Sequence, residues 1–119
     1  MAFSEFEIKR LQKIVGSFIE KHRPPPHIQK ELDLAFRIEN QSVIIFEIRP
    51  AWKQPKEFIE FNVAKATFVK NQNLWKVYWQ RADLKWHTYE PVESVKNIDE
   101  FLSVVKNDEY HCFNGITYT

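Results

Sequence analysis

Two acidic residues and one arginine are the clearest candidates for catalytic chemistry. Asp33 stands in one segment of alternating polar and apolar residues, and Glu47-Ile48-Arg49 stands in the next. An acid followed later by an acid and a base is typical of metal-dependent nucleases, in which two carboxylates hold a metal ion beside the attacked phosphate. The base is usually lysine, so the arginine weakens the motif. One hypothesis is therefore a metal-dependent hydrolase that uses Asp33 and Glu47, and the other is a structural ion pair between Asp33 and Arg49.

The other reactive residues form no recognisable site. The histidines and the single cysteine have no spacing that would place two zinc ligands on one element. His111 and Cys112 are neighbours, and neighbouring residues of an extended segment point to opposite sides, so they are not a nucleophile and its base. Gly16 and Gly115 are the only glycines and build no phosphate-binding loop. We predict no catalytic residue, no metal and no cofactor, and we favour a protein that is not an enzyme.

Size and composition favour one folded domain in a reducing compartment. The chain has 119 residues, of which 44% are hydrophobic, and this length matches one domain over residues 1–119. Its formal charge of +1 is far from the basic excess typical of nucleic-acid binding, although it does not exclude nucleic acid. One cysteine permits no intramolecular disulfide, and no stretch resembles a transmembrane helix or a signal peptide. We expect a cytoplasmic protein without membrane contact.

A helix is predicted near each end of the sequence. Ser4 and Glu7 have the spacing of a capping box, and apolar residues at helical spacing continue over residues 5–22. The three prolines that follow exclude helical geometry. A second capping pair, of the form Asn-x-x-Glu, precedes an apolar stripe that predicts a short helix ending near Asn107.

Alternation of polar and apolar residues predicts an antiparallel sheet in the middle of the chain. The connections are short, so successive strands should lie side by side as a meander. The fold class is therefore α+β, with a four- or five-stranded antiparallel meander and an N-terminal and a C-terminal helix. The predicted strands are 32–39, 43–49, 58–70, 74–81 and 85–89. The tail from Asp108 to Thr119 is apolar enough to pack back against the domain.

The apolar pattern also predicts the register of three hairpins, because a buried face fixes which residues lie opposite one another. Their loops are expected at residues 40–42, 71–72 and 83–84. The predicted pairs are Asp33 with Arg49 and Phe36 with Phe46; Lys65 with Tyr78 and Ala64 with Trp79; and Arg81 with Trp86, Gln80 with His87 and Tyr78 with Tyr89. In this arrangement small residues face tryptophans on a core surface. Arg81 would form a cation–π contact with Trp86.

One side of this sheet is a candidate binding surface. If both helices cover the tryptophan-rich side, tyrosines, lysines, a histidine and a glutamine collect on the side that faces solvent. The alternative is that a helix or the tail crosses that side and leaves the same residues as ordinary cross-strand pairs. The predicted binding residues are Arg49, Trp52, Lys65, Lys76, Tyr78, Gln80, His87 and Tyr89, of which Arg49 and Trp52 lie at the edge.

Several short motifs, in order along the chain, carry a family resemblance. They are Pro25-Pro26-His27-Ile28, Arg37-Ile38-Glu39, Glu47-Ile48-Arg49-Pro50 with Trp52, Trp75-Lys76-Val77-Tyr78-Trp79, Lys85-Trp86-His87-Thr88-Tyr89, and Asn107-Asp108-Glu109 with Phe113-Asn114-Gly115. On these motifs nearly the whole chain resembles a bacterial family catalogued as domain of unknown function 3024. The resemblance implies a bacterial, cytoplasmic, single-domain protein, and it implies no substrate, cofactor or activity. Leu84 stands where that family favours glycine, so a turn with positive φ would be strained here.

The function predicted from these observations is a non-catalytic binding module. Its partner is nucleic acid or protein, because aromatic residues on an open sheet can stack on unpaired bases while lysines contact phosphates. The known RNA-binding strand motifs are absent from the sequence. Two alternatives remain: the hydrolase with Asp33 and Glu47, and a structural or regulatory homodimer formed through an edge strand.

Overall fold

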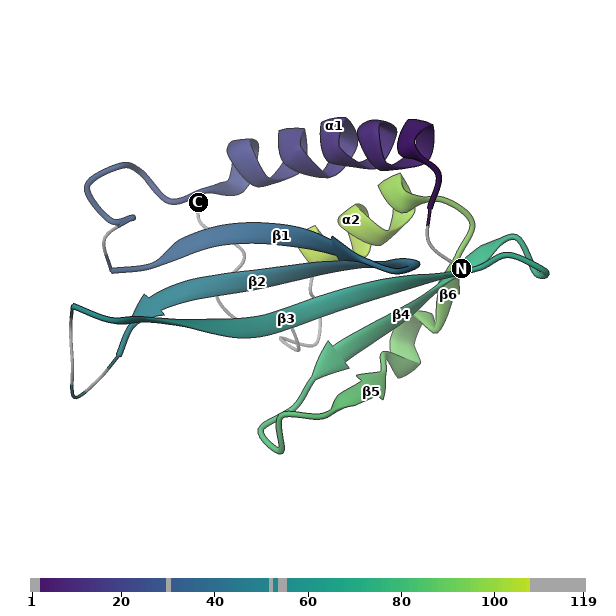
Figure 1. Ribbon diagram of the computed structural model, residues 1–119. Coiled ribbons are helices and arrows are strands. Elements are labelled where there is room, and N and C mark those ends of the chain that lie inside the picture. Colours follow the sequence, from purple (N-terminus) through teal and green to yellow (C-terminus); the bar gives the residue numbers. More distant parts are fainter. Residues whose placement is uncertain (1–2, 30, 52, 54–55, 108–119) are drawn as a thin grey trace.

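The predicted fold class is confirmed. The computed structural model describes residues 3–29, 31–51, 53 and 56–107. Along the chain, these residues form an N-terminal helix, then an antiparallel meander and then a C-terminal helix (Figure 1). The elements are α1 (Glu5–His22), β1 (Asp33–Glu39), β2 (Ser42–Pro50), β3 (Phe58–Val69), β4 (Leu74–Gln80), β5 (Trp86–Thr88), the 3-10 helix η1 (Glu90–Val92), β6 (Ser94–Val95) and α2 (Ile98–Asn107). The predictions for Trp52 and for the tail from Asp108 onward, His111 and Cys112 included, concern residues outside the described set.

Both helices begin at the predicted caps. At the start of α1, Ser4 N–H donates to Glu7 Oε1 at 3.1 Å and Glu7 N–H donates to Ser4 Oγ at 3.2 Å, which completes the capping box. The helix ends before Pro24, with Arg23 in extended geometry. At the start of α2, Glu100 N–H donates to Asn97 Oδ1 at 2.9 Å. No described helix is long and apolar enough to cross a membrane.

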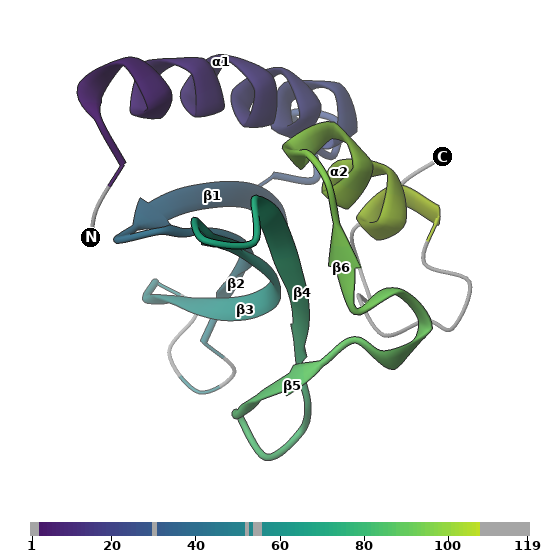
Figure 2. The ribbon, with the colours of Figure 1, turned by 90° about the vertical axis from the view of Figure 1, so that its right-hand side faces the viewer.

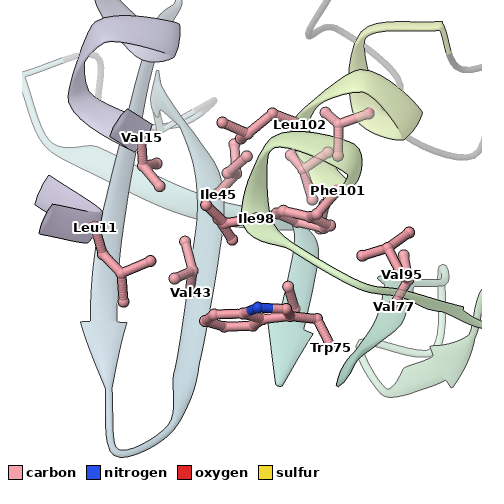
Figure 3. Packing of buried hydrophobic residues seen from close by; sticks show 14 of the residues in the cluster. Leu11, Val15, Val43, Ile45, Trp75, Val77, Val95, Ile98, Phe101 and Leu102 are labelled. Carbon is pink, nitrogen blue, oxygen red and sulfur yellow. The ribbon is translucent and has the colours of Figure 1, made fainter. Parts of the chain in front are cut away.

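The five longer strands are ordered β1-β2-β3-β4-β5. The short β6 pairs with the same edge of β4 as β5 does, at Trp75 and Lys76 instead of residues 78–80. Both helices lie on the same side of this sheet (Figure 2). The core between the helices and the sheet contains Leu11 and Val15 from α1, Phe101 from α2, and Ile45 and Val77 from the strands (Figure 3). The opposite side of the sheet is covered by neither helix, which is the arrangement that the binding-surface hypothesis requires.

The register of the β3–β4 hairpin is confirmed. Lys65 lies opposite Tyr78, and Ala64 lies opposite Trp79. Small residues on β3 alternate with aromatic residues on β4, so only one alignment places both sets in the core. The core side of β4 carries Trp75, which is buried, and Trp79, which packs partly buried against the same cluster.

The register predicted for β1 and β2 is wrong by one residue. Phe36 lies opposite Ile45 rather than Phe46, and Asp33 lies opposite Ile48 rather than Arg49. The turn contains two residues instead of three, because Asn40 adopts a left-handed conformation with φ of 51°. The ion pair predicted between Asp33 and Arg49 does not form.

The register predicted for β4 and β5 is also wrong by one residue. Its turn contains three residues, 82–84, closed by a hydrogen bond from Arg81 N–H to Lys85 O at 3.2 Å. The third turn residue, Leu84, has φ of 62°, as such three-residue hairpins require. Gln80 therefore lies opposite Trp86 instead of His87. Leu84 thus adopts positive φ at the position where the family favours glycine, so the strain foreseen for such a turn applies here.

Leu84→Gly is expected to raise the free energy of unfolding by about 1 kcal/mol. A left-handed conformation costs a non-glycine residue on the order of 1–2 kcal/mol, and the side chain of Leu84 is 71% exposed, so its loss removes little packing. Urea denaturation measures the change. Asn73→Gly is the matched control, because Asn73 has φ of 51° and asparagine tolerates that geometry. Equal gains at both positions would contradict strain at Leu84.

Candidate functional site

The side of β3, β4 and β5 that neither helix covers carries a group of polar and aromatic side chains. We call it the lysine–aromatic face, and it consists of Lys65, Lys76, Tyr78, Gln80, Trp86 and Thr88. Because side chains alternate along a strand, these residues point away from the core residues Ala64, Ala66 and Val77. Lys76 and Thr88 are exposed, and the other four are partly buried.

Lys65 occupies the centre of the lysine–aromatic face. Its ammonium Nζ lies 5.0 Å from the centroid of the Tyr78 ring and 4.8 Å from the centroid of the Trp86 ring. Both distances are in the range of cation–π attraction. Burial lowers the pKa of the Lys65 ammonium, and attraction by Glu39 offsets this only in part. The charge is thus held by two aromatic rings and partly removed from water.

Apolar residues form the base of the same side on β2. Ile44 lies opposite Lys65, and both Ile44 and Phe46 are buried although neither belongs to the main core. The Arg37 guanidinium lies 4.9 Å from the Phe46 ring centroid and is also paired with carboxylates of Glu39 and Glu60. Arg37 therefore covers apolar surface, and its charge is balanced by Glu39 and Glu60. On the lysine–aromatic face, Lys65 and Lys76 form no ion pair with another described residue.

A pocket lies beside Tyr78, between β4 and the segment from Thr88 to Ser94. Its volume is about 320 Å³, and its walls include Lys76, Tyr78, Thr88, Glu93 and Ser94. Polar groups dominate these residues, so the pocket suits a hydrophilic ligand group. It extends the lysine–aromatic face along β4.

Four of the predicted binding residues are brought together, namely Lys65, Lys76, Tyr78 and Gln80. Three are placed elsewhere, and the prediction that they share this surface is wrong. His87 lies opposite Trp79 on the helix side, with its Nε2 2.8 Å from Asp83 Oδ2. Tyr89 is buried in the core, and Arg49 is bound to Glu47 on the helix side of β2.

The sequence prediction missed Trp86 and Thr88 as members of this face. The predicted contact of Trp86 with Arg81 is wrong, since Arg81 lies over Trp79 at 5.5 Å. A single extra residue in the β4–β5 turn reverses every side chain of β5, so His87 and Tyr89 exchange sides with Trp86 and Thr88. The signal for the longer turn was the residue at 84, where the family pattern favours glycine.

Asp33 and Glu47 do not form the carboxylate pair that a metal-dependent hydrolase would need. Asp33 accepts hydrogen bonds from Arg23 Nη2 at 2.8 Å and from Arg23 Nε at 3.0 Å, and Arg23 lowers the pKa of Asp33. Glu47 lies opposite Leu34, the residue after Asp33, so the two carboxylates start from opposite sides of the sheet. Within the part of the chain that the structure describes, no cluster of three histidine, cysteine or acidic residues could hold a metal ion.

Glu47 is the one buried charged side chain among the described residues. Its Oε1 accepts hydrogen bonds from Arg49, at 3.0 Å from Nη2, while its Oε2 is buried and has no hydrogen-bond partner within the described part of the chain. Burial raises the pKa of Glu47, although Arg49 acts in the opposite direction. Burial of the Glu47 carboxylate lowers the stability of the fold. Glu47 and Arg49 lie on the helix side of the sheet, so they are not part of the lysine–aromatic face.

Fold and site together define a class of small α+β protein, in which a meander sheet carries two helices on one side and a lysine–aromatic surface on the other. The chain belongs to the family described as "Domain of unknown function (DUF3024)", whose model matches residues 3–115. The family resemblance of the sequence motifs is thereby confirmed. The search of curated proteins and the search of solved structures each found no match to this chain.

Proposed function

We propose that this chain is a non-catalytic binding module that holds its partner on the lysine–aromatic face. The observation that supports this function is the Lys65 ammonium held over the Tyr78 and Trp86 rings, on the side of the sheet without a helix. Aromatic and cationic side chains contribute most of the binding energy at many interfaces. The partner is a nucleic acid or a protein. We further propose that the chain is a single domain of a bacterial protein. We also propose that it is cytoplasmic, and the lone cysteine supports this location.

Selection from two random ligand pools tests this function. One pool is a library of displayed peptides and the other is single-stranded DNA, and both are selected on the full chain. Ligands enriched from at least one pool are expected to lose affinity by about tenfold or more in Lys65→Met and in Trp86→Leu. Lys9→Met is the matched control, because Lys9 is exposed on α1 and undergoes the same change of charge. Enriched ligands from both pools that bind all variants equally would overturn the proposal.

A homodimer is the second candidate, and one observation favours it. β1 is an edge strand of the sheet, so its outer edge pairs with no described strand. Such an edge can pair with the same strand of a second copy. The molecular mass in solution, measured by analytical ultracentrifugation, tests this arrangement, and a monomer at high concentration would exclude it.

A further inference from the structure

We propose that the ligand of the lysine–aromatic face is single-stranded nucleic acid, an inference that rests on the function proposed above. In this mode a base stacks on Trp86 and Tyr78, and the Lys65 ammonium moves from the rings to the adjacent phosphate. The cation–π contact of the free protein then marks the position that a base takes in the complex.

The two rings have the chemistry of a stacking platform. Tyr78 and Trp86 lie on neighbouring strands, and Lys65 reaches both from the next strand. Stacking of a base on an aromatic side chain contributes on the order of 1–3 kcal/mol and tolerates any sequence. Lysine has a long flexible stem and a compact charge, so its ammonium can leave the rings while its stem stays on the sheet. A phosphate beside the stacked base would receive that charge.

The positive charge of the chain is concentrated on the strands that carry this face. Residues 58–88, which span β3 to β5, contain five lysines and arginines and two acids, Glu60 and Asp83, whereas the whole chain has 17 basic and 16 acidic residues. Asp83 is in contact with His87 on the opposite side of the sheet. Glu60 on β3 and Glu39 on β1 are both paired with Arg37. The charge of β3 to β5 therefore complements a phosphate backbone, despite a net charge of only +1.

The adjoining pocket gives a second contact along the same strands. Lys76 stands at its wall as an exposed cation, and Tyr78 belongs both to the pocket and to the stacking pair. The side chains of Thr88 and Ser94 add hydroxyl groups that can donate to phosphate or sugar oxygens. Glu93 also lines the pocket, and its carboxylate would repel a phosphate placed next to it. A strand of nucleic acid thus runs from Trp86 past Tyr78 to Lys76.

Two other ligand classes fit this face less well. The centre of a protein interface is apolar, but the large hydrophobic side chains exposed in the described residues, Phe6, Phe58, Ile59, Phe61 and Leu84, all lie outside the lysine–aromatic face. A cationic ligand would need the place over the rings that Lys65 holds, and it would be repelled by the charge of Lys65. A base linked to a phosphate uses both the rings and the cation.

Fluorescence anisotropy of the full chain with fluorescein-labelled oligothymidylate and oligouridylate tests the inference. Binding is expected to weaken linearly on a logarithmic scale between about 50 and 200 mM salt. Trp86→Leu should lower the affinity by about tenfold or more, and Lys65→Met should also reduce the slope with salt by about 0.7, the value of one phosphate contact. Lys9→Met, which removes an exposed cation on α1 away from this face, should change neither. Backbone chemical shifts of the wild type locate the contact without any variant.

Each remaining outcome has a definite meaning. No binding at low salt, binding that is independent of salt, or shifts confined to the helix side would overturn the nucleic-acid inference. If oligonucleotides fail while selected peptides still require Lys65 and Trp86, this inference is wrong and the proposed binding module stands. If neither pool yields a ligand that depends on these residues, the proposed function itself fails.

Discussion

Phe101→Ala is expected to lower the free energy of unfolding by about 3–5 kcal/mol, the range for removing a large aromatic side chain from a core. Phe101 is fully buried on α2, between that helix and the sheet (Figure 3). The helix is only 10 residues long, so its stability depends on this apolar face rather than on its own hydrogen bonds. Because small domains are stable by roughly 5–15 kcal/mol, the variant loses a large part of the total.

Thermal and urea denaturation measure this loss, and the chain offers a matched control. The side chain of Phe6 on α1 is 78% exposed, so Phe6→Ala should change the free energy of unfolding by less than about 0.5 kcal/mol. The midpoint temperature of Phe101→Ala should fall by roughly 10 °C or more. A loss below about 1 kcal/mol would mean that α2 is not an integral part of the core.

The two α-helices and the five longer strands could be predicted from local signals, whereas η1 and β6 were not predicted. The capping box at Ser4, the prolines after α1 and the alternation along the strands each depend on nearby residues, and each predicted the element that the structure contains. The β3–β4 register could also be predicted, since only one side of each strand suits the core. Short-range sequence patterns therefore predicted the fold class, whereas the side of the sheet that the helices cover is known only from the structure.

The two wrong registers have a physical cause in the turns and in β2. Residues 43–47 of β2 are buried on both sides, so alternation could not choose between two alignments with β1. The alignment of β1 with β2 was therefore determined by the turn, in which Asn40 adopts positive φ and the loop has two residues. In the last hairpin Leu84 adopts positive φ and lengthens the loop to three. An unusual backbone angle at a single residue decided in each case which side chains share a face.

The candidate site depended on the second of these turns. The side of the sheet on which the β3 and β4 residues lie was predicted correctly because their hairpin register was correct, whereas the sides of the β5 residues were reversed. Trp86 thereby replaces His87 beside Lys65. This correction changed the chemistry of the surface from a mixed polar patch to a cation between two aromatic rings.

Glu47→Leu is expected to stabilise the protein by about 1–4 kcal/mol near neutral pH, the gain sometimes found when a buried ion pair is replaced by an apolar residue. The Glu47 side chain is 5% exposed, and one of its oxygens has no hydrogen-bond partner among residues 3–29, 31–51, 53 and 56–107. Arg49 is 46% exposed and can be solvated when the carboxylate is removed. The residues opposite Glu47 on the adjacent strands, Leu34 and Phe61, are apolar and would pack against leucine.

The dependence on pH distinguishes this explanation from a simple gain in packing. The pKa of Glu47 is higher in the folded than in the unfolded protein, so the folded state disfavours the ionised form. The wild type therefore loses stability as the pH rises from the unfolded-state value, about 4.3, through the folded value. The advantage of Glu47→Leu should be smallest near pH 4 and should grow to a plateau above the folded pKa. Urea denaturation across this range measures it, with Glu60→Leu on exposed β3 surface as the control. An advantage that is the same at every pH would show that the buried charge has no cost.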